Sequence, residues 1–432
     1  MRVAYVILSY LLAPAAFGFL LWRGFTNRAY WQRLGERLGF GECRLEVPSI
    51  WIHAVSVGEV QAAAALVKRL LERYPTTPMV LTTVTPTGLQ TAQVKFGDTV
   101  HYSYAPYDLP RAVRRFFDRV KPKLAIVLET ELWPNLYHEC GKRNVPLVLA
   151  SARISPRSVH KYRRLLGLFR EALSHGIVIA AQSERDAERF RSLGANPART
   201  HVTGNIKFDF ELPESVAHEG RRLRALQAPD RPVWIAASTH EAEEELVLNA
   251  LERLRAEVPD VLLMLVPRHP DRFESVAALL RFRRLSFVRR SSGDVCDQHT
   301  AVFLGNSLGE LPMFYAAADV AFVGGSLVPV GGHNLLEPAA LALPVLTGPH
   351  NFNAEEIAAL LIEQGAAHVV SNADELAAAL VRYFREPELR ARDGNAGLDT
   401  VRANRGALER LIRLVDPLLH PHDERPSPVG GL

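Results

Sequence analysis

The 432-residue chain has the composition of a folded globular protein, with 48% hydrophobic and 23% charged residues. This balance excludes an intrinsically disordered chain, and the length favours two domains over a single core. The net charge is only +4 and no zinc-finger or RNA-binding motif occurs, so nucleic acid is not an expected partner. Three distant cysteines without metal-ligand spacing are typical of a reducing compartment.

Residues 1–24 predict a membrane anchor. The segment from Val3 to Trp22 carries no charged residue and is long enough to cross a bilayer as a helix. Pro14 and Gly18 weaken a soluble helix, but helices in membranes tolerate them. Two alternatives stay open: a cleaved signal peptide, and a helix that lies on the membrane without crossing it.

Basic residues follow the anchor and predict its orientation. Because positively charged flanks stay on the cytoplasmic side, we expect the rest of the chain in the cytoplasm. A second basic and apolar stretch, "SARISPRSVHKYRRLLGLF", is expected to face anionic lipids too, although a solvated arginine-rich helix face is the simpler alternative. The residues concerned are Arg23, Arg28, Arg33 and Arg37 in the first stretch, and Arg153, Arg157, Lys161, Arg163, Arg164, Leu165, Leu166, Leu168 and Phe169 in the second.

Residues 25–210 alternate between strand-like and helical segments. Five segments are rich in β-favouring residues: "SIWIHAVS", "MVLTTVT", "LAIVLE", "PLVLASA" and "GIVIAAQ". Segments with helical periodicity lie between them, such as "LPRAVRRFFDRV" and "ERDAERFRSLG". Such alternation forms βαβ units, so we expect an N-terminal Rossmann-like domain with a parallel sheet.

Glu59 stands where a strand passes into a helix, in "WIHAVSVGEVQAAAALVKRLL". Ligands of open α/β sheets bind at the carboxyl ends of the strands, so this carboxylate is a candidate catalytic group. A glutamate in the first turn also suits the positive end of the helix dipole. The spacing alone favours this structural role over catalysis.

The alternation breaks at residues 211–230, which we expect to link two domains because they are polar and rich in proline. A second α/β series then follows over residues 231–415, with strands predicted at "PVWIAAS", "VLLMLVP", "LSFVRR", "TAVFLG", "DVAFVGG" and "LPVLTG". Residues 416–432 lack apolar periodicity and are expected to be disordered. The predicted fold class is therefore α/β, with two Rossmann-like domains whose parallel sheets face a cleft.

The absence of several sequence motifs excludes some classes of enzyme. Neither domain has a G-x-G-x-x-G turn after its first strand, so we expect no nicotinamide or flavin cofactor. P-loop, metalloprotease and nucleophile-elbow motifs are missing as well. Two-domain enzymes that bind a nucleotide by other means remain, and the largest such group is the nucleotide-sugar transferases.

The second domain carries polar groups at its predicted strand ends. The motif "STHEAEEE" precedes a helix, where Ser238 would cap the helix or help to bind a phosphate. Arg268 ends a buried strand, and its guanidinium fork fits a phosphate. In "GGSLVPVGGHNLLEP", glycines allow backbone to approach a ligand closely, and Asn334 and Glu337 begin a helix. A carboxylate there can accept both ribose hydroxyls.

These motifs together resemble one family. The set "SVGEV", "TPTG", "ETELWPNL", "SAR", "TGNIKFD", "STHEAEEE", "LVPRHP", "LGEL" and "GGSLVPVGGHNLLEP" is similar, in one register from the anchor to about Val415, to the 3-deoxy-D-manno-octulosonic acid (Kdo) transferases of lipid A synthesis. The resemblance implies a GT-B fold, an acceptor-binding N-terminal domain, a donor-binding C-terminal domain and a place at the inner membrane. It also implies CMP-Kdo as donor, the lipid A precursor lipid IVA as acceptor and inversion at the anomeric carbon.

The resemblance also implies the site residues. Glu59 corresponds to the family's proposed general base, and Glu129 and Lys207 to its proposed transition-state stabilisers. Glu36, in "GERLG", matches the family but receives no catalytic step. With the resemblance, catalysis becomes the favoured role of Glu59. The implied CMP contacts are Pro267, Arg268, Leu308, Gly309, Glu310, Asn334, Leu335, Leu336 and Glu337.

The leaving group implied by the resemblance bears on metal use. CMP has a single phosphate and lacks the diphosphate that usually chelates a divalent ion, so fixed cations and helix N-termini would suffice. We therefore expect neither an essential metal nor a cofactor. Two rival classes stay open: a UDP-sugar transferase of the same fold that acts on a membrane lipid, and a non-catalytic, membrane-anchored nucleotide-binding protein.

Several neighbouring residues have structural alternatives. Lys207 is one of only 7 lysines beside 44 arginines, which hints at a need for a compact ammonium, but a surface lysine capping a strand would fit too. Trp133 and Pro134 are expected to pack rather than to bind. Core or cap roles are at least as good an account as ligand contact for His53, Arg153 and His240.

Overall fold

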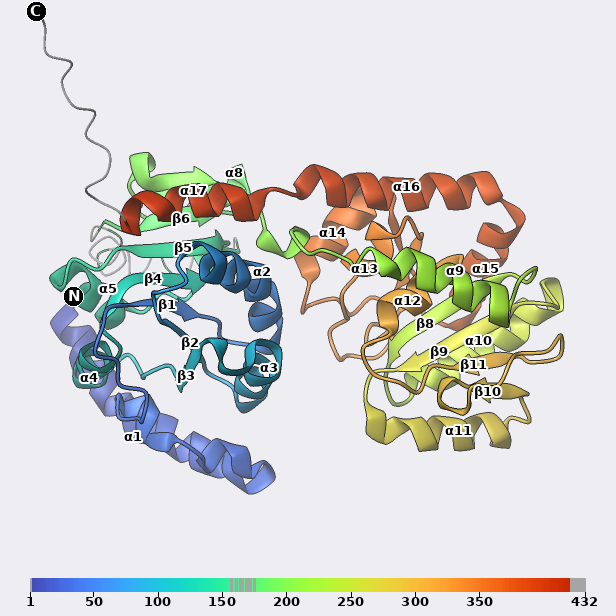
Figure 1. Ribbon diagram of the computed structural model, residues 1–432, viewed down its shortest axis with the longest axis horizontal. Coiled ribbons are helices and arrows are strands. Elements are labelled where there is room, and N and C mark those ends of the chain that lie inside the picture. Colours follow the sequence, from blue (N-terminus) through green and yellow to red (C-terminus); the bar gives the residue numbers. More distant parts are fainter. Residues whose placement is uncertain are drawn as a thin grey trace, which may run out of the picture. The chain divides into compact units, whose positions relative to one another are not determined.

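The computed structural model of the protein describes residues 2–155, 158, 159, 162, 167, 173 and 176–419. The chain divides into two compact units, one made of Met1–Phe210 with Arg405–Leu432 and the other of Glu211–Asn404. Each unit is an α/β domain built on its own sheet (Figure 1).

A seven-stranded parallel sheet, in the order β3-β2-β1-β4-β5-β6-β7, forms the centre of the described part of the first unit. The order runs outward from β1 and β4, so the topological switch point lies between these two strands. Glu59 follows β1 and Glu129 follows β4, which places both beside the switch point. The strands are β1 (Ser49–His53), β2 (Met79–Thr83), β3 (His101–Tyr104), β4 (Pro122–Leu128), β5 (Leu147–Ala152), β6 (Val178–Ala181) and β7 (Thr200–Val202).

Helices cover both faces of this sheet, because alternate strand residues point to opposite sides. Trp51 packs against Phe116 and Phe117 on one face, whereas its neighbours Ile50 and Ile52 enter the core on the other. The helices on the Trp51 face are α4 (Pro110–Val120), α5 (Pro134–Lys142) and α8 (Glu184–Ser192), and those on the other are α2 (Val57–Arg73), α3 (Pro86–Phe96) and α17 (Ala407–Leu419).

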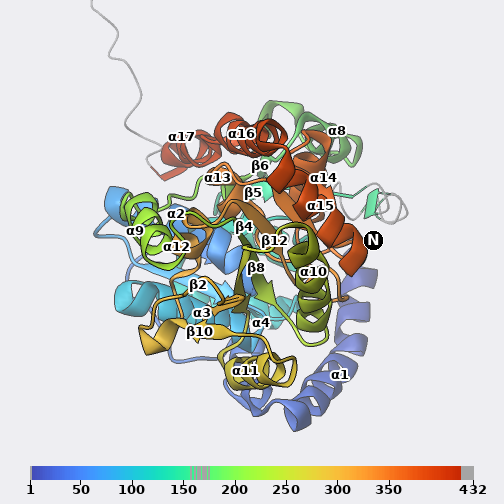
Figure 2. The same cartoon turned by 90° about the vertical axis from the view of Figure 1, so that its right-hand side faces the viewer.

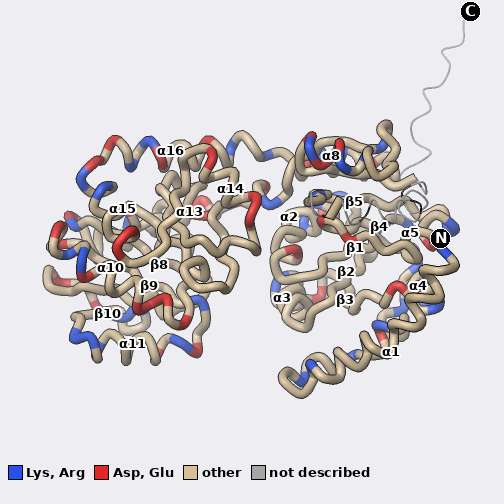
Figure 3. Tube along the Cα trace, turned by 180° about the vertical axis from the view of Figure 1, so that it is seen from behind, with Lys and Arg blue, Asp and Glu red and all other residues tan. Residues whose placement is uncertain are grey.

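Helix α1 (Arg2–Thr26) is long and apolar enough to cross a membrane, and a signal sequence would pass the same test. It is uncharged along most of its length (Figure 3). Contacts join it to the first unit: the Tyr5 hydroxyl donates to Asp108 Oδ2 at 2.8 Å, and the rings of Phe17 and Tyr107 meet edge-on with centroids 5.3 Å apart. The 3₁₀ turns η1 (Arg28–Trp31) and η2 (Leu34–Leu38) follow it.

The second unit repeats this topology in its own sheet. Its order is β10-β11-β9-β8-β12-β13-β14, again parallel throughout, so its switch point lies between β8 and β12. The strands are β8 (Val233–Thr239), β9 (Leu262–Pro267), β10 (Phe287–Arg289), β11 (Val302–Leu304), β12 (Val320–Val323), β13 (Val345–Thr347) and β14 (Ala367–Val369).

Helices also cover both faces of the second sheet. Helices α10 and α15 lie side by side on one face together with α11 (Figure 2), and α9 and α12 cover the other. The helices are α9 (Ser215–Gln227), α10 (Glu243–Glu257), α11 (Phe273–Phe282), α12 (Leu311–Ala316), α13 (Leu336–Ala340), α14 (Glu355–Glu363), α15 (Ala373–Arg385) and α16 (Pro387–Asn404). Of the remaining 3₁₀ turns, η3 (Gly97–Thr99), η4 (Pro197–Arg199) and η5 (Ile206–Phe208) belong to the first unit. The turns η6 (Pro270–Arg272) and η7 (Arg290–Ser292) belong to the second.

The domain boundaries differ from the sequence-based expectation. Most of the expected linker is helix α9, which packs on α12 and the second sheet and belongs to the second unit. The chain then returns to the first unit, where Leu411 and Val415 of α17 join the core beside Ile50, so the expected second domain ends too late (Figure 1). The first residues of the expected disordered tail complete α17, and residues 420–432 lie outside the described part of the chain.

Three strands were not predicted: β3, β7 and β14. All three are edge strands of three or four residues. They include polar and exposed residues, because an edge strand has only one neighbour and less cover than a central one. The predicted strands correspond to the remaining members of the two sheets.

Candidate active site

Glu59 lies in the first turn of α2, and its carboxylate closes the start of that helix. The Glu59 backbone N–H points to the Oγ of the N-cap residue Ser56 at 3.5 Å, and the Ser56 hydroxyl donates to Glu59 Oε1 at 3.2 Å. The Val55 N–H donates to Glu59 Oε2 at 2.8 Å. The structural role expected of a first-turn glutamate is therefore present, in a form close to a capping box.

The electrostatics of Glu59 go beyond capping. Burial, together with the negative charges of Glu129 and Glu131, raises the pKa of its carboxyl from 4.5 to about 7, against the opposing hydrogen bonds from Val55 and Ser56. A general base works best when its pKa lies near the working pH. The same side chain can thus cap a helix and accept a proton near neutrality.

Glu129 and Lys207 form an ion pair. Lys207 Nζ lies 2.7 Å from Glu129 Oε1, and Arg153 Nε lies 3.4 Å from Oε2. Asn205 holds the lysine backbone by accepting its N–H at 2.9 Å, at the start of η5. Glu129 has φ +56°, a left-handed conformation that is uncommon outside glycine and that clusters at functional sites. Residues 78 positions apart in the chain therefore meet at the carboxyl edge of the sheet.

Glu131 is a charged neighbour that the sequence analysis did not single out. Burial raises the pKa of its carboxyl, while the Trp133 indole N–H donates to its Oε2 at 2.7 Å. Trp133 also packs on the His53 ring, with centroids 5.2 Å apart, as expected. His53 is fully buried beside Thr82, and burial lowers its pKa to about 4, so it is neutral at pH 7. The second glutamate of "ETELWP" was the available signal for this cluster.

In the second unit, a buried carboxylate fills the glycine-rich loop after β12. Glu243 is fully buried and accepts the backbone N–H groups of Gly325 at 2.7 Å, Ser326 at 3.1 Å and Leu327 at 2.9 Å, and that of His240 at 3.2 Å. The expectation that this loop offers its backbone to a ligand is therefore wrong for these donors, because their hydrogens already have a partner.

The expected cap of α10 also differs. The residue before the helix is Ala242, and no side chain caps it. The Thr239 hydroxyl instead donates to Glu244 Oε1 at 3.3 Å, and Glu244 pairs with Arg272 at 3.0 Å. Ser238 is buried with φ +56°, at the carboxyl end of β8.

Arg268 is the exposed cation expected at the end of β9. Its backbone N–H donates to Thr239 O at 3.0 Å, which ties it to the end of β8, while Pro267 before it is buried. No hydrogen bond or ion pair joins its guanidinium to another residue of the described ranges. A cation fixed at a strand end without a protein partner is placed to receive an anion.

The "LGEL" motif has an ion pair that the sequence did not reveal. Arg290 binds Glu310 with two hydrogen bonds, from Nε at 3.1 Å and from Nη2 at 2.7 Å, and they lower the pKa of the Glu310 carboxyl. Gly309 has φ +81°, which turns the chain before α12, and Leu308 is 70% exposed. The Glu310 carboxylate is thus engaged within the protein, whereas its neighbours are open.

Asn334 and Glu337 meet at the start of α13, as their spacing predicted. Asn334 Oδ1 accepts the Leu336 N–H at 3.0 Å, and its amide donates to Glu337 Oε1 at 3.0 Å. Leu335 and Leu336 are buried, so a ligand would meet their backbone rather than their side chains. Burial raises the pKa of the Tyr315 hydroxyl far above its usual value, and the negative charge of Glu337 raises it too.

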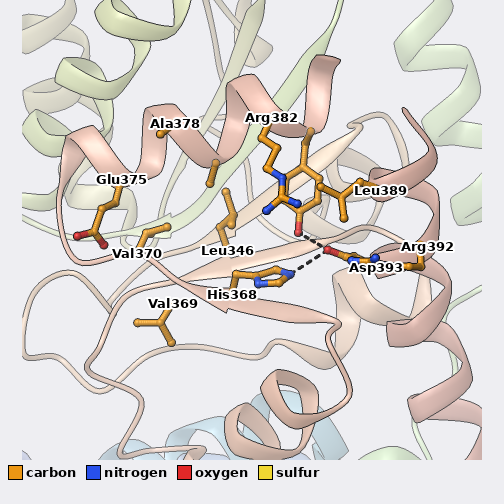
Figure 4. Close-up of a pocket in the computed structure, with 12 residues that line it drawn as sticks. Leu346, His368, Val369, Val370, Glu375, Ala378, Arg382, Leu389, Arg392 and Asp393 are labelled. Carbon is orange, nitrogen blue, oxygen red and sulfur yellow. Dashed lines mark hydrogen bonds and ion pairs between the residues drawn. The ribbon is translucent and has the colours of Figure 1, made fainter. Parts of the chain in front are cut away.

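A cavity of about 280 Å³ lies elsewhere in the second unit, between β13, β14, α15 and α16 (Figure 4). Its polar wall is built on Asp393, which accepts hydrogen bonds from Tyr383 at 2.9 Å and meets His368 Nε2 at 2.9 Å. None of the predicted site residues lines it. Among the described residues, no group of three or more His, Cys, Asp or Glu is arranged to hold a metal.

Comparison with known proteins identifies the family to which this chain belongs. A family model described as "3-Deoxy-D-manno-octulosonic-acid transferase (kdotransferase)" matches residues 32–210. The 3-deoxy-D-manno-octulosonic acid transferase of Haemophilus influenzae is 45% identical over 421 residues, covering 97% of this chain and 99% of that protein. The Bordetella pertussis enzyme of the same name is 37% identical over 428 residues, covering 95% and 99%. The chain belongs to the Kdo transferase family.

The fold also has solved counterparts. The structure of S. aureus MnaA with UDP matches with a TM-score of 0.56 at 16% identity, over 89% of this chain and all of that one. At this identity the likeness shows the fold alone. The resemblance drawn from the motifs is thus confirmed at the level of the Kdo transferase family, and the α/β fold of GT-B type is confirmed with it.

Proposed function

We propose that the protein transfers Kdo from CMP-Kdo to the lipid A precursor lipid IVA, with inversion, in the assembly of the lipopolysaccharide core. Its membership of the Kdo transferase family supports the transfer of Kdo. The observation that carries the mechanism is the Glu59 carboxyl, whose pKa is raised to about 7 at the carboxyl edge of the first sheet. Neutral pH then leaves a large share of it deprotonated and able to act as a base.

Glu59 is the general base in this proposal. The acceptor hydroxyl attacks the anomeric carbon of Kdo while its proton passes to the Glu59 carboxylate. The new C–O bond forms on the face opposite to the bond that breaks, and the electron pair of the broken bond leaves with the CMP phosphate. Attack and departure on opposite faces give inversion with one base, as in inverting glycoside hydrolysis.

Lys207 and Glu129 stabilise the charge that develops in the transition state. Glu129 holds the ammonium at 2.7 Å and Arg153 lies on the other carboxylate oxygen, which fixes the position of two cations around one anion. Such preorganised charges need no reorganisation when the reaction occurs. Glu129 therefore positions Lys207, and Lys207 meets the negative charge.

The second unit holds the donor. Arg268 receives the phosphate, because it is an exposed cation at a strand end, and Glu337 accepts the ribose hydroxyls from its place at the start of α13. We expect the single phosphate to need no divalent metal. The other proposed CMP contacts are Pro267, Leu308, Gly309, Glu310, Asn334, Leu335 and Leu336.

The inner membrane is the proposed location, with the catalytic domains on the cytoplasmic side. Exposed apolar residues of α1 support contact with lipid; Leu11, Trp22 and Phe25 are 70%, 65% and 78% exposed. Arg153 of the second basic stretch pairs with Glu129 and so does not need a lipid partner. The rest of that predicted membrane surface, Arg157, Lys161, Arg163, Arg164, Leu165, Leu166, Leu168 and Phe169, lies outside the described residues.

Incubation with CMP-Kdo and lipid IVA, followed by mass spectrometry of the lipid, tests this function. We expect the lipid to gain Kdo with the wild-type protein and not with Glu59→Gln. A panel of UDP-sugars on the same lipid tests the rival donor class. Transfer from a UDP-sugar, with none from CMP-Kdo, would contradict the proposal.

A further inference from the structure

Two histidines meet across the switch point of the second sheet. His240 follows β8 and His333 follows β12, the two strands that flank the switch point. Their Nε2 atoms lie 2.8 Å apart, and their ring planes differ by only 4° with centroids 5.0 Å apart. The rings therefore point at each other edge to edge, which is the geometry of an N–H···N hydrogen bond rather than of stacking.

The backbone around the pair is built to hold it. Glu243 Oε2 accepts the N–H of both His240 and Gly325, and so ties the two strand ends together. Gly325 has φ +69°, and a Cβ there would lie 3.0 Å from the His333 ring and 3.4 Å from that of His240. The glycine therefore leaves the space that the two rings occupy. Glu243, the second glutamate of "STHEAEEE", and the glycine loop after β12 therefore hold the two histidines together.

Basic side chains surround the pair. Arg268 and His269 act on it from the end of β9, and Arg272 from η6, while on α10 Glu243 accepts the His240 backbone N–H and Glu244 pairs with Arg272. The His269 ring meets that of His240 edge-on with centroids 5.3 Å apart. Burial and these basic neighbours lower the pKa of both histidines, that of His333 to about 4, so the pair is neutral at pH 7 without a ligand.

We propose that His240 and His333 take up a shared proton when a phosphate monoester binds at Arg268, and that the charged pair then holds the leaving phosphate. This inference rests on the donor site proposed above and adds two phosphate-binding residues to it. An anion on Arg268 reverses the local field, because it offsets the cation that opposes protonation. The free enzyme is neutral at this point, and the phosphate complex carries one more positive charge.

The proton has a defined place. In the neutral pair, one ring donates its Nε2 hydrogen and keeps a lone pair on Nδ1, while the other accepts. The added proton joins that Nδ1, so the Nε2···Nε2 bond survives and its donor becomes an imidazolium. When the bond from Kdo to phosphate breaks, the phosphodiester of the donor becomes a monoester with one more negative charge, and the pair takes up its proton from solvent at this step. The imidazolium neutralises that charge by a hydrogen bond and returns its proton to solvent when CMP leaves.

The test counts protons. The full chain in detergent micelles is titrated with CMP at pH 7.0 by calorimetry, in buffers of different ionisation enthalpy. CMP is then mostly a dianion, because the second pKa of a phosphate monoester is about 6. We expect the wild type to take up a fraction of a proton. His333→Gln and His240→Gln should bind CMP about 10- to 100-fold more weakly and lose the uptake.

His299→Gln is the matched control, because it removes an exposed histidine of the same unit. It should bind CMP and take up protons like the wild type. CMP binding by the wild type without proton uptake would overturn the inference and leave the donor site intact, even if the variants did not fold. Uptake that survives in both variants would also overturn it. No CMP binding by the wild type would instead contradict the donor site itself.

Discussion

The two sheets place a glutamate at the same point of the fold and use it differently. Glu59 follows β1 in the first turn of α2, and Glu243 follows β8 in the first turn of α10. Glu59 is half-buried and accepts one backbone N–H and one hydroxyl. Glu243 is fully buried and accepts four backbone N–H groups.

The number of hydrogen-bond donors fixed on the carboxylate distinguishes a structural glutamate from a catalytic one at this position. Four N–H groups engage both oxygens of Glu243, three of them from the loop after β12 and one from His240, so it has no free position to accept a proton from a substrate. Two donors leave Glu59 with open acceptor positions, and burial beside Glu129 and Glu131 raises its pKa to about 7. A first-turn glutamate is therefore not catalytic by position alone.

The largest effect is expected at Glu59. Glu59→Gln keeps the shape and the hydrogen-bond acceptor but cannot take a proton, so turnover at saturating substrates should fall about 10²- to 10⁴-fold. The thermal midpoint and CMP affinity should change little. Glu72→Gln, on the exposed side of the same helix, is the control and should keep full activity. Wild-type turnover by Glu59→Gln would reduce this residue to a helix cap.

Lys207 is expected to matter next. Lys207→Met removes the ammonium that Glu129 holds, and turnover should fall about 10²- to 10³-fold, the usual loss for one preorganised charge. Steady-state kinetics with both substrates measures this. The exposed Lys68 on α2 offers a control, since Lys68→Met should be neutral. If donor and acceptor kinetics of Lys207→Met match the wild type, the ion pair is structural.

Glu243 should show the opposite pattern. Glu243→Gln loses the charge that four N–H groups share, and we expect the free energy of unfolding to drop by about 2–4 kcal/mol. Thermal or urea unfolding measures the loss, and Glu245→Gln in the same turn is an exposed control. Turnover of the fraction that stays folded should fall less than in Glu59→Gln. A Glu243→Gln variant that is fully stable but inactive would contradict this account, because it would give Glu243 the catalytic role and not the structural one.

The smallest effect is expected at Glu337. Glu337→Ala should raise the KM for CMP-Kdo about tenfold, because the ribose hydroxyls lose their acceptor, and leave the KM for the lipid unchanged. Initial rates at varied donor concentration give this value. An unaltered donor KM would mean that the ribose is held elsewhere.

The sequence was most informative where apolar pattern and burial coincide. Central strands such as β4 are buried at nearly every position and were predicted, whereas the edge strands β3, β7 and β14 were missed because they are short and partly polar. No local pattern in the residues of α17 says which of the two sheets this helix covers. The return of the chain to the first unit therefore required the structure.

For the candidate site residues too, local pattern located single positions but not contacts between distant segments. Glu59 and Asn334 stand at strand-to-helix turns that periodicity locates, and both were predicted. The Lys207–Glu129 pair joins residues 78 positions apart, and Arg290 reaches Glu310 over 20, so no local spacing predicts either contact. Glu243 was not singled out, because nothing in its own segment shows the loop that it binds.

The pH dependence of kcat/KM tests the central claim, that the Glu59 carboxylate is the base, most directly. A base must be deprotonated, so the rate should fall about tenfold per pH unit below a midpoint near 7 and level off above it. Glu131→Gln removes a like charge that raises the pKa of Glu59, so it should shift this midpoint to lower pH. A wild-type rate that stays flat between pH 5 and 8 would contradict the account.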